Sequence, residues 1–149
     1  MIEVYRTSVI PAPAKHVWAL VRDFNAMPEW NPTIKTSTIE DGPADRIGCR
    51  RRLVFDDGSA WIHELTGLSD AEMTISYAIV GVPEATRVPM RNYHATIHLE
   101  PVVDGDRCFI AWRATLETEN ESAVRERAGA VFQAGLDGLK LKFGVAVRI

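Results

Sequence analysis

The chain has 149 residues, of which 46% are apolar and 25% are charged. These proportions are typical of one soluble globular domain, here expected to cover residues 1–149. The net charge of −3 gives no reason to expect a nucleic-acid or anionic-membrane partner. The one basic run, Arg50 to Arg52, is too short for a nucleic-acid binding stripe.

The chain also lacks the signals of secretion and membrane insertion. No apolar run approaches the roughly 20 residues of a membrane span. The first residues have neither the basic start nor the apolar stretch of a signal peptide. Cys49 and Cys108 are far apart and form no CxxC pair, which is typical of free thiols in a reducing compartment. We therefore expect a cytoplasmic protein without stable membrane insertion.

The N-terminal third predicts a strand followed by helix. Residues 2–10 are rich in β-branched side chains and are followed by prolines. In residues 14–24 the apolar side chains recur at the spacing of one helical face. The next segment, 23–32 (DFNAMPEWNP), is too rich in proline for more than a second short turn of helix. Trp30 lies in this segment, and we expect it to cover the mouth of a ligand pocket.

The middle of the chain predicts strands separated by turns. The turns are mostly Asp-Gly sequences, which favour short hairpins and hence antiparallel neighbours. The predicted strands are 33–40, 47–56, 59–66, 72–80, 90–101 and 107–118.

The C-terminal part predicts one long helix after an Asn120 or Ser122 cap. Its apolar stripe consists of Val124, Ala128, Val131, Phe132, Gly135, Leu136, Leu139 and Phe143. Strands grouped between helices predict an α+β fold with a sheet covered on one face.

The first Asp-Gly turn allows the inner face of two strands to be predicted. A tight hairpin at Asp57-Gly58 would place Leu53 opposite Ile62 and Arg51 opposite Glu64. We take these residues and Phe55 as the inner face. Trp61 and His63 would then face outward, where Trp61 could mark a self-association patch.

The second Asp-Gly turn predicts a clearer pair of faces. With the turn at 104–105, Ile97 lies opposite Trp112 and Tyr93 opposite Leu116. The other face of this hairpin is polar and carries His94 and His98. Strand 72–80 alternates in the same way, with Met73, Ile75, Tyr77 and Ile79 on one side.

The histidines do not suggest a familiar catalytic or metal site. His94 and His98 would be about 13 Å apart on a strand, too far to share one metal ion. His16 lies on the first helix. No nucleophile has an evident base partner, and no Gly-rich phosphate loop is present. We expect neither a metal nor a nucleotide cofactor.

Three glycines lie inside the predicted C-terminal helix, at 129, 135 and 138. Each costs roughly 1 kcal/mol of helix stability relative to Ala. One interpretation is close packing of the helix backbone on the sheet. The other is that small residues leave room for a pocket, because a wide curved sheet is not filled by a single helix.

These elements carry a family resemblance over nearly the whole length. The matching pieces are APAKHVWALVRDFNAMPEW, Gly48, Arg51, the HEL segment with Glu64, Tyr77, NYHATIHLEPV, IAWRATLE and FQAGLDGLK. The chain resembles the helix-grip superfamily of START domains and birch-pollen-type allergens, and most closely its bacterial polyketide cyclase/dehydrase-like (SRPBCC) branch. The resemblance implies a seven-stranded curved antiparallel sheet wrapped around the long C-terminal helix, with two short helices after the first strand.

The resemblance also implies a deep apolar cavity between sheet and helix for a lipid- or polyketide-like molecule. Binders, carriers and enzymes share this scaffold, so it does not settle the activity. The expected ligand-binding residues are Trp30, Arg51, Leu53, Phe55, Ile62, Glu64, Ile75, Tyr77, Tyr93, Ile97, Trp112, Phe132, Gly135, Leu136 and Leu139.

The candidate catalytic residues are Arg51, Glu64, Tyr77 and Tyr93. Arg51 could hold a carboxylate or enolate, and Glu64 could act as a general base. Alternatively, Arg51 and Glu64 neutralise each other as a cross-strand pair, and the tyrosines only fill the core. We expect a monomer or homodimer that binds a hydrophobic small molecule; a cyclase or dehydrase and an interaction protein are the alternatives.

Overall fold

The computed structural model describes residues 1–83 and 89–144. Its strands are β1 (Ile2–Ile10), β2 (Ile34–Asp41), β3 (Arg50–Phe55), β4 (Ala60–Ser69), β5 (Thr74–Gly81), β6 (Arg91–Val102) and β7 (Arg107–Glu117). Its helices are α1 (Ala14–Val21), the 3-10 turn η1 (Met27–Glu29) and α2 (Glu121–Gly144). The predicted element order is confirmed.

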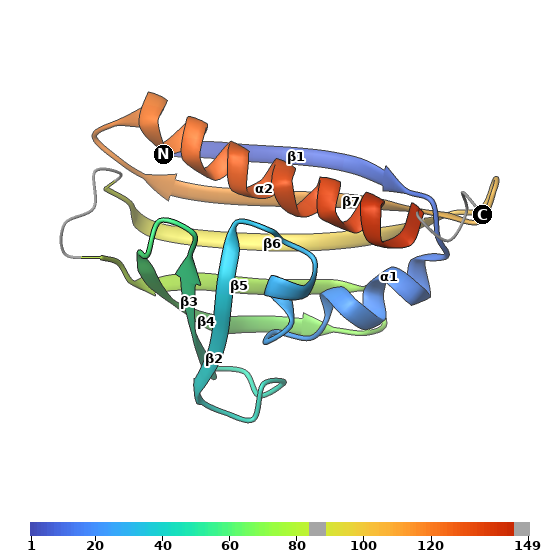
Figure 1. Cartoon of the computed structure of the whole chain (residues 1–149), viewed down its shortest axis with the longest axis horizontal. Helices are drawn as coiled ribbons and strands as arrows, with labels where there is room; N and C mark the ends of the chain where they lie inside the picture. The colour runs from blue at the N-terminus through green and yellow to red at the C-terminus, as the bar shows by residue number, and fades with distance from the viewer. Residues whose placement is uncertain (84–88, 145–149) are drawn as a thin grey trace.

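The strands form one antiparallel sheet in the order β1-β7-β6-β5-β4-β3-β2. Figure 1 shows α2 lying along one face of the sheet beside β1 and β7. On the same side, α1 contacts β6 and β7, and η1 contacts β2. The core lies between these helices and the concave face of the sheet. The expected helix-grip architecture, with two short helical elements after the first strand, is confirmed.

The sheet is curved, and irregular pairing accompanies the curvature. Register shifts occur between β2 and β3, between β4 and β5, and between β6 and β7. A β-bulge bends its strand and increases the local twist. Figure 1 shows the result, with β2 running across the direction of β6 and β7. As a result, α2 lies against the concave face of the sheet.

The predicted register of the β6–β7 hairpin is confirmed over most of its length. Leu99 pairs with Ile110, Ile97 with Trp112, and Ala95 with Ala114. The connection has four residues, 103–106, rather than the predicted two. The loop is longer by one residue on each side of the same centre, so the cross-strand partners and the face of each side chain are unchanged. The pairing of Tyr93 with Leu116 is replaced by a register shift between Arg91 and His94. Tyr93 is nevertheless buried.

The predicted register of the β3–β4 hairpin is wrong by one residue. Arg51 pairs with His63, Leu53 with Trp61, and Arg50 with Glu64. The backbone N–H of Phe55 donates to the carbonyl oxygen of Ser59 at 2.9 Å, which leaves a three-residue loop, 56–58, in which Gly58 has a positive φ of 84°. A turn followed by such a left-handed residue is a common three-residue hairpin connection. A one-residue slip reverses the faces of β4. Trp61 and His63 are therefore buried, which removes the expected exposed patch at Trp61.

The glycines of α2 allow a close approach of the segment that follows η1. A Cβ built at Gly138 would lie 1.8 Å from the carbonyl oxygen of Trp30, and one at Gly135 would lie 2.8 Å from the Trp30 ring. Asn31, fully buried, donates from Nδ2 to the carbonyl oxygen of Val131 at 3.1 Å. The helix backbone is thus closely packed at these glycines, but mainly against the segment of Trp30 rather than on the sheet as expected.

The N-terminus of α2 is capped as the sequence predicts. Asn120 accepts a hydrogen bond from the backbone N–H of Ala123 at its Oδ1, with a distance of 3.3 Å. Among the helices in the described part of the chain, none is long and apolar enough to cross a membrane.

Candidate functional site

A pocket lies between the concave face of the sheet and α2. Most of its wall is apolar or aromatic, and its polar side chains are His63, Tyr77, Tyr93 and Arg127. The remaining lining residues are Met27, Ile34, Leu53, Phe55, Trp61, Ile79, Met90, Trp112, Ala128, Val131 and Phe132. The free volume is about 40 Å³, room for no more than a few water molecules. The expected deep cavity is thus largely filled by side chains.

The pocket adjoins a wide groove on the surface. This groove has a volume of about 740 Å³ and shares Phe55, Arg127 and Val131 with the pocket. Arg127 forms an ion pair with Asp57 at 3.1 Å, which connects α2 to the β3–β4 loop. Its guanidinium also lies 5.2 Å from the ring centre of Phe55 and 5.3 Å from that of Trp61. Arg127 therefore lies at the boundary between pocket and groove.

Arg51 extends from β3 into the interior and is 2% exposed. Its Nη1 donates to the carbonyl oxygen of Phe24 at 2.6 Å, and its Nη2 lies 3.0 Å from Nδ1 of His63. Its guanidinium carbon stands 3.9 Å from the centre of the Phe24 ring. Burial lowers the pKa of Arg51 to about 10, so the group remains charged at neutral pH. Within the described residues, no carboxylate forms an ion pair with it.

His63 connects Arg51 to the pocket. Because arginine can only donate, Nδ1 of His63 accepts and the imidazole proton is on Nε2. The imidazole stacks on the Tyr77 ring, with centres 4.6 Å apart. Burial, and then the charge of Arg51, hold the pKa of His63 well below 6.5. His63, part of the pocket wall, is therefore neutral at physiological pH, with its proton on Nε2.

The tyrosines complete the polar part of the wall. The Tyr77 hydroxyl accepts a hydrogen bond from Nε1 of Trp112 at 3.2 Å. Burial raises the pKa of Tyr77, and it raises that of Tyr93 well above 10, with the neighbouring Tyr77 as the next cause. Both hydroxyls thus stay protonated. Because they are also hydrogen-bonded to each other, one of the two protons is engaged and the other can be donated to a ligand oxygen.

A small inner chamber of about 10 Å³ lies beside the pocket. It shares Met27 and Tyr77 with the pocket wall. Its other lining residues are Val21, Asp23, Phe24, Trp30, Arg51, Ile75 and Ile97. Among the side chains that the structure describes, two buried nitrogens lack a hydrogen-bond partner, Trp30 Nε1 and Arg51 Nε. Both belong to residues of this chamber.

Several expected site residues lie elsewhere. Glu64 is on the outer face, where its Oε1 accepts from Nε of Arg50 at 3.1 Å, so the expected Arg51–Glu64 pair is wrong. Ile62 is on the same outer face and packs near Gly81. Trp30 is 3% exposed and packs on Trp112, with ring centres 5.6 Å apart. Trp30 therefore lies in the interior and does not cover a mouth.

The remaining expected residues divide into three groups. Leu53, Phe55, Tyr77, Tyr93, Trp112 and Phe132 line the pocket. Ile75 and Ile97 line the chamber with Tyr77, Trp30 and Arg51. Gly135, Leu136 and Leu139 are buried on α2 and line neither space.

Sequence reasoning missed other lining residues, of which Trp61 and His63 matter most. The hairpin register placed them outside, and Gly58 was the signal of a three-residue loop. Arg127 was missed because a charged side chain on α2 is usually solvated.

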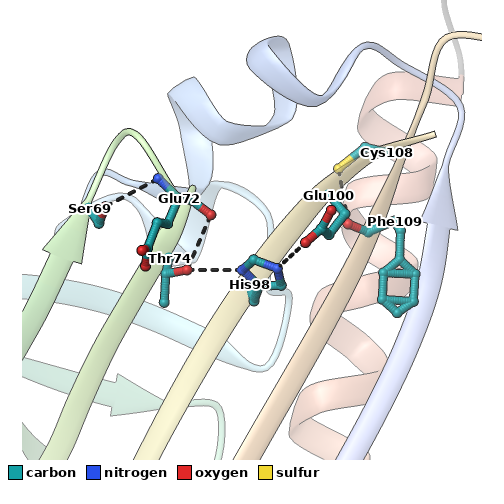
Figure 2. Close-up of polar contacts among 7 residues, drawn as sticks. All are labelled: Ser69, Glu72, Thr74, His98, Glu100, Cys108 and Phe109. Atoms are coloured by element: carbon teal, nitrogen blue, oxygen red, sulfur yellow. Dashed lines mark hydrogen bonds and ion pairs between the residues drawn. The ribbon is translucent and has the colours of Figure 1, made fainter. Parts of the chain in front are cut away.

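A second polar cluster lies on the outer face of the sheet. Figure 2 shows His98 between Thr74 and Glu100, with Nδ1 2.9 Å from Thr74 Oγ1 and Nε2 2.8 Å from Glu100 Oε1. Thr74 Oγ1 lies 3.3 Å from the carbonyl oxygen of Glu72, which competes with His98 for the single hydroxyl proton. The order hydroxyl, imidazole, carboxylate resembles a nucleophile with its base. The pocket, chamber and groove contain none of these residues, and their contacts connect β5 to β6.

Within residues 1–83 and 89–144, no three His, Cys, Asp or Glu side chains gather as metal ligands would. His94 and His98 do lie on the polar outer face, as the alternation of β6 predicts.

Comparison with known proteins identifies the architecture. Residues 1–144 match the family described as "Polyketide cyclase / dehydrase and lipid transport". A search of curated proteins gave no match. Among solved structures, a protein of Nitrosospira multiformis is similar at 28% identity and a TM-score of 0.85, with 99% of this chain and 100% of the other covered.

Two further structures agree with this result. A protein of Thermobifida fusca has 26% identity and a TM-score of 0.79, covering 97% of this chain and 94% of its own. Ara h 8.0201 is similar in fold, with 19% identity, a TM-score of 0.76, and 95% and 97% of the two chains covered. The chain described here belongs to the polyketide cyclase/dehydrase and lipid transport family of the SRPBCC superfamily.

Proposed function

We propose that this protein binds a hydrophobic small molecule, of lipid or polyketide type, between the sheet and α2. The observation that carries this proposal is the pocket itself, an apolar and aromatic wall with few polar groups. Such a wall is typical of sites that hold an apolar molecule and orient it by a few hydrogen bonds. The family description, which includes lipid transport, supports the same class of ligand.

A ligand must displace side chains, because the free volume is far below the 300–1,000 Å³ or so of ordinary ligand sites. Met27 and Met90 line the pocket, and methionine adapts to new neighbours at little cost. Arg127 is held at the boundary by a partly exposed ion pair. We therefore place the entry between α2 and the β3–β4 loop, where the pocket adjoins the groove.

The polar groups favour binding over proton abstraction. The lone pair of His63 Nδ1 is engaged by Arg51, and the pKa of His63 lies well below 6.5. Glu64, the expected base, is on the outer face. Among the described residues that line the pocket, none is a carboxylate. The pocket therefore offers donors to a ligand oxygen, and a cyclase or dehydrase is the second candidate on account of those donors and of Arg51.

The experiment is a ligand panel with a pocket-filling variant. Val131 lines the pocket and is half-buried, so Val131→Trp fills the space without touching the deep core. Gln133→Trp, on the exposed face of α2, is the matched control. We expect apolar ligands to raise the melting temperature and change the Trp emission of wild type and Gln133→Trp only.

The ligand concentration determines how much the bound ligand stabilises the folded protein. At free ligand a hundredfold above its dissociation constant, linkage adds about 2.7 kcal/mol to the free energy of unfolding. Mass spectrometry of an organic extract of the purified protein identifies a carried ligand. The proposal is wrong if no member of a broad apolar panel binds to folded wild type, or if Val131→Trp binds as well as wild type does.

A further inference from the structure

Two residues that line the inner chamber carry donors for which the structure gives no acceptor. Trp30 Nε1 and Arg51 Nε are buried and unpartnered, and both residues line this one space. A buried donor without a partner destabilises the fold, and does so more strongly when the group is charged. Two such donors around one chamber indicate a site for an acceptor atom.

The charge of Arg51 specifies the kind of acceptor. Its neighbours are the Phe24 carbonyl oxygen, the neutral His63 imidazole and two aromatic rings, none of which carries a negative charge. A buried cation is normally paired, because desolvation of an isolated charge is expensive. Asp23 also lines the chamber, but it is exposed, and its Oδ1 accepts from the backbone N–H of Asn25. Among the residues that the structure describes, Arg51 thus has no carboxylate paired with it in the chamber.

The chamber adjoins the pocket, so one ligand could occupy both. Met27 and Tyr77 form a wall common to both spaces. His63, which contacts Arg51, is itself part of the pocket wall. The free volume of the chamber, about 10 Å³, is that of a single small atom. A polar head at the end of an apolar chain can enter it when the flexible Met27 side chain moves.

We propose that the ligand of the pocket carries an ionised carboxylate, and that Arg51 and the Trp30 indole N–H bind one of its oxygens in the inner chamber. This inference rests on the proposed function and adds the chemical class of the head group. A free small carboxylate could make the same contacts. The experiment therefore distinguishes a carboxylate on an apolar chain from a free carboxylate.

The test compares decanoate with decan-1-ol, which share one chain and differ in the head. Dissociation constants are measured at pH 8 by Trp emission, below micellar concentrations, with sodium acetate as a third probe. A charge-assisted hydrogen bond is worth about 1.5–3 kcal/mol, so we expect decanoate to bind roughly tenfold or more tightly than decan-1-ol. Acetate at the same concentrations should bind no more than weakly.

Three variants locate the effect. Arg51→Gln should remove the preference, so that its dissociation constants for decanoate and decan-1-ol become about equal. Arg51→Lys, which keeps the charge, should restore part of the preference. Trp30→Phe removes only the indole N–H and should reduce the preference by about threefold to tenfold. Trp30→Phe keeps the test available should either Arg51 variant fail to fold.

The outcomes are distinguishable. Equal binding of decanoate and decan-1-ol by wild type overturns the carboxylate inference and leaves the proposed function intact. A preference that survives Arg51→Gln overturns the assignment of the head to the chamber. Stabilisation by acetate without a preference for decanoate makes the chamber a site for a free anion. Absence of binding by both ten-carbon probes overturns the inference along with the proposed function for ligands of this size.

Discussion

Nη2 of Arg51 lies 3.0 Å from Nδ1 of His63, and both side chains are buried. Arg51 donates and His63 accepts, so the imidazole carries its proton on Nε2. Protonation of Nδ1 would remove this hydrogen bond and place two positive charges in contact away from water. The pair therefore holds His63 neutral in the folded protein.

This arrangement predicts a loss of stability in mild acid. The folded-state pKa of His63 is well below 6.5, mainly because of burial and then because of Arg51. Above pH 6.5 the imidazole is neutral in both states. Below pH 6.5 the unfolded chain takes up a proton that the folded chain does not. Stability should therefore fall as the pH drops, by up to about 1.4 kcal/mol per pH unit from this residue.

Urea unfolding at several pH values between 5 and 8 measures the slope. His63→Gln, whose amide oxygen can accept from Arg51, should flatten it relative to wild type. His94→Gln, on the exposed outer face, is the control and should keep it. A wild-type slope retained in His63→Gln would contradict the prediction.

The second prediction concerns energetic coupling between side chains. Arg51 contacts His63 on the inner face, whereas Glu64 pairs with Arg50 on the outer face. A double-mutant cycle of Arg51→Met and Glu64→Gln should therefore give a coupling below about 0.5 kcal/mol. A cycle of Arg51→Met and His63→Leu should give about 0.5–3 kcal/mol. Glu64→Gln alone should cost less than about 1 kcal/mol, because the Arg50–Glu64 pair is partly exposed. Strong coupling of Arg51 to Glu64 would restore the cross-strand pair expected from the sequence.

The third prediction compares two glycines of α2. In a helix interior, Gly→Ala is worth up to about 1 kcal/mol of stability. At Gly129 the new methyl group meets the end of the flexible Arg6 side chain, at 2.7 Å from Nη2, which can move away. At Gly138 it meets the backbone oxygen of Trp30 at 1.8 Å. Gly129→Ala should be neutral or stabilising, and Gly138→Ala should destabilise by about 1–3 kcal/mol. Thermal and urea unfolding measure the stability of both variants. A stabilising Gly138→Ala would mean that Trp30 is not packed against α2.

The fourth prediction concerns entry to the pocket. Arg127→Met removes the ion pair to Asp57 at the boundary between pocket and groove. Ligand association and release should both become faster, because the change acts on the barrier between them. The free energy of unfolding should change by less than about 1 kcal/mol, since the ion pair is partly exposed. Stopped-flow Trp emission measures both rates.

Two further variants test the assignment of this entry. Arg125→Met is the control. It removes another ion pair of α2, between Arg125 and Glu121 at 2.9 Å, and should leave both rates unchanged. Trp30→Ala should behave as a core truncation and cost about 3–5 kcal/mol. Faster release from Trp30→Ala without loss of stability would return Trp30 to the mouth of the pocket.

The sequence by itself determined the element order, the antiparallel sheet and the faces of β5 to β7. These features depend on local patterns, namely alternation along one strand and turn residues between neighbours. The predicted β6–β7 register was correct even though the loop is longer than predicted. Val102 pairs with Arg107, so the loop is still centred on residues 104 and 105. The sequence left the helix cap between Asn120 and Ser122 for an equally local reason, and the structure has Asn120 in that role.

Only the tertiary structure decided the composition of the site. Asp56-Asp57-Gly58 suits a two-residue or a three-residue loop, and the choice between them is what turns His63 and Trp61 inward and Glu64 outward. The role of Gly135 and Gly138 depends on Trp30, more than one hundred residues away, which fills the space beside them. How much of the pocket remains empty depends on the combined packing of distant side chains, and strand periodicity carries no information on that volume.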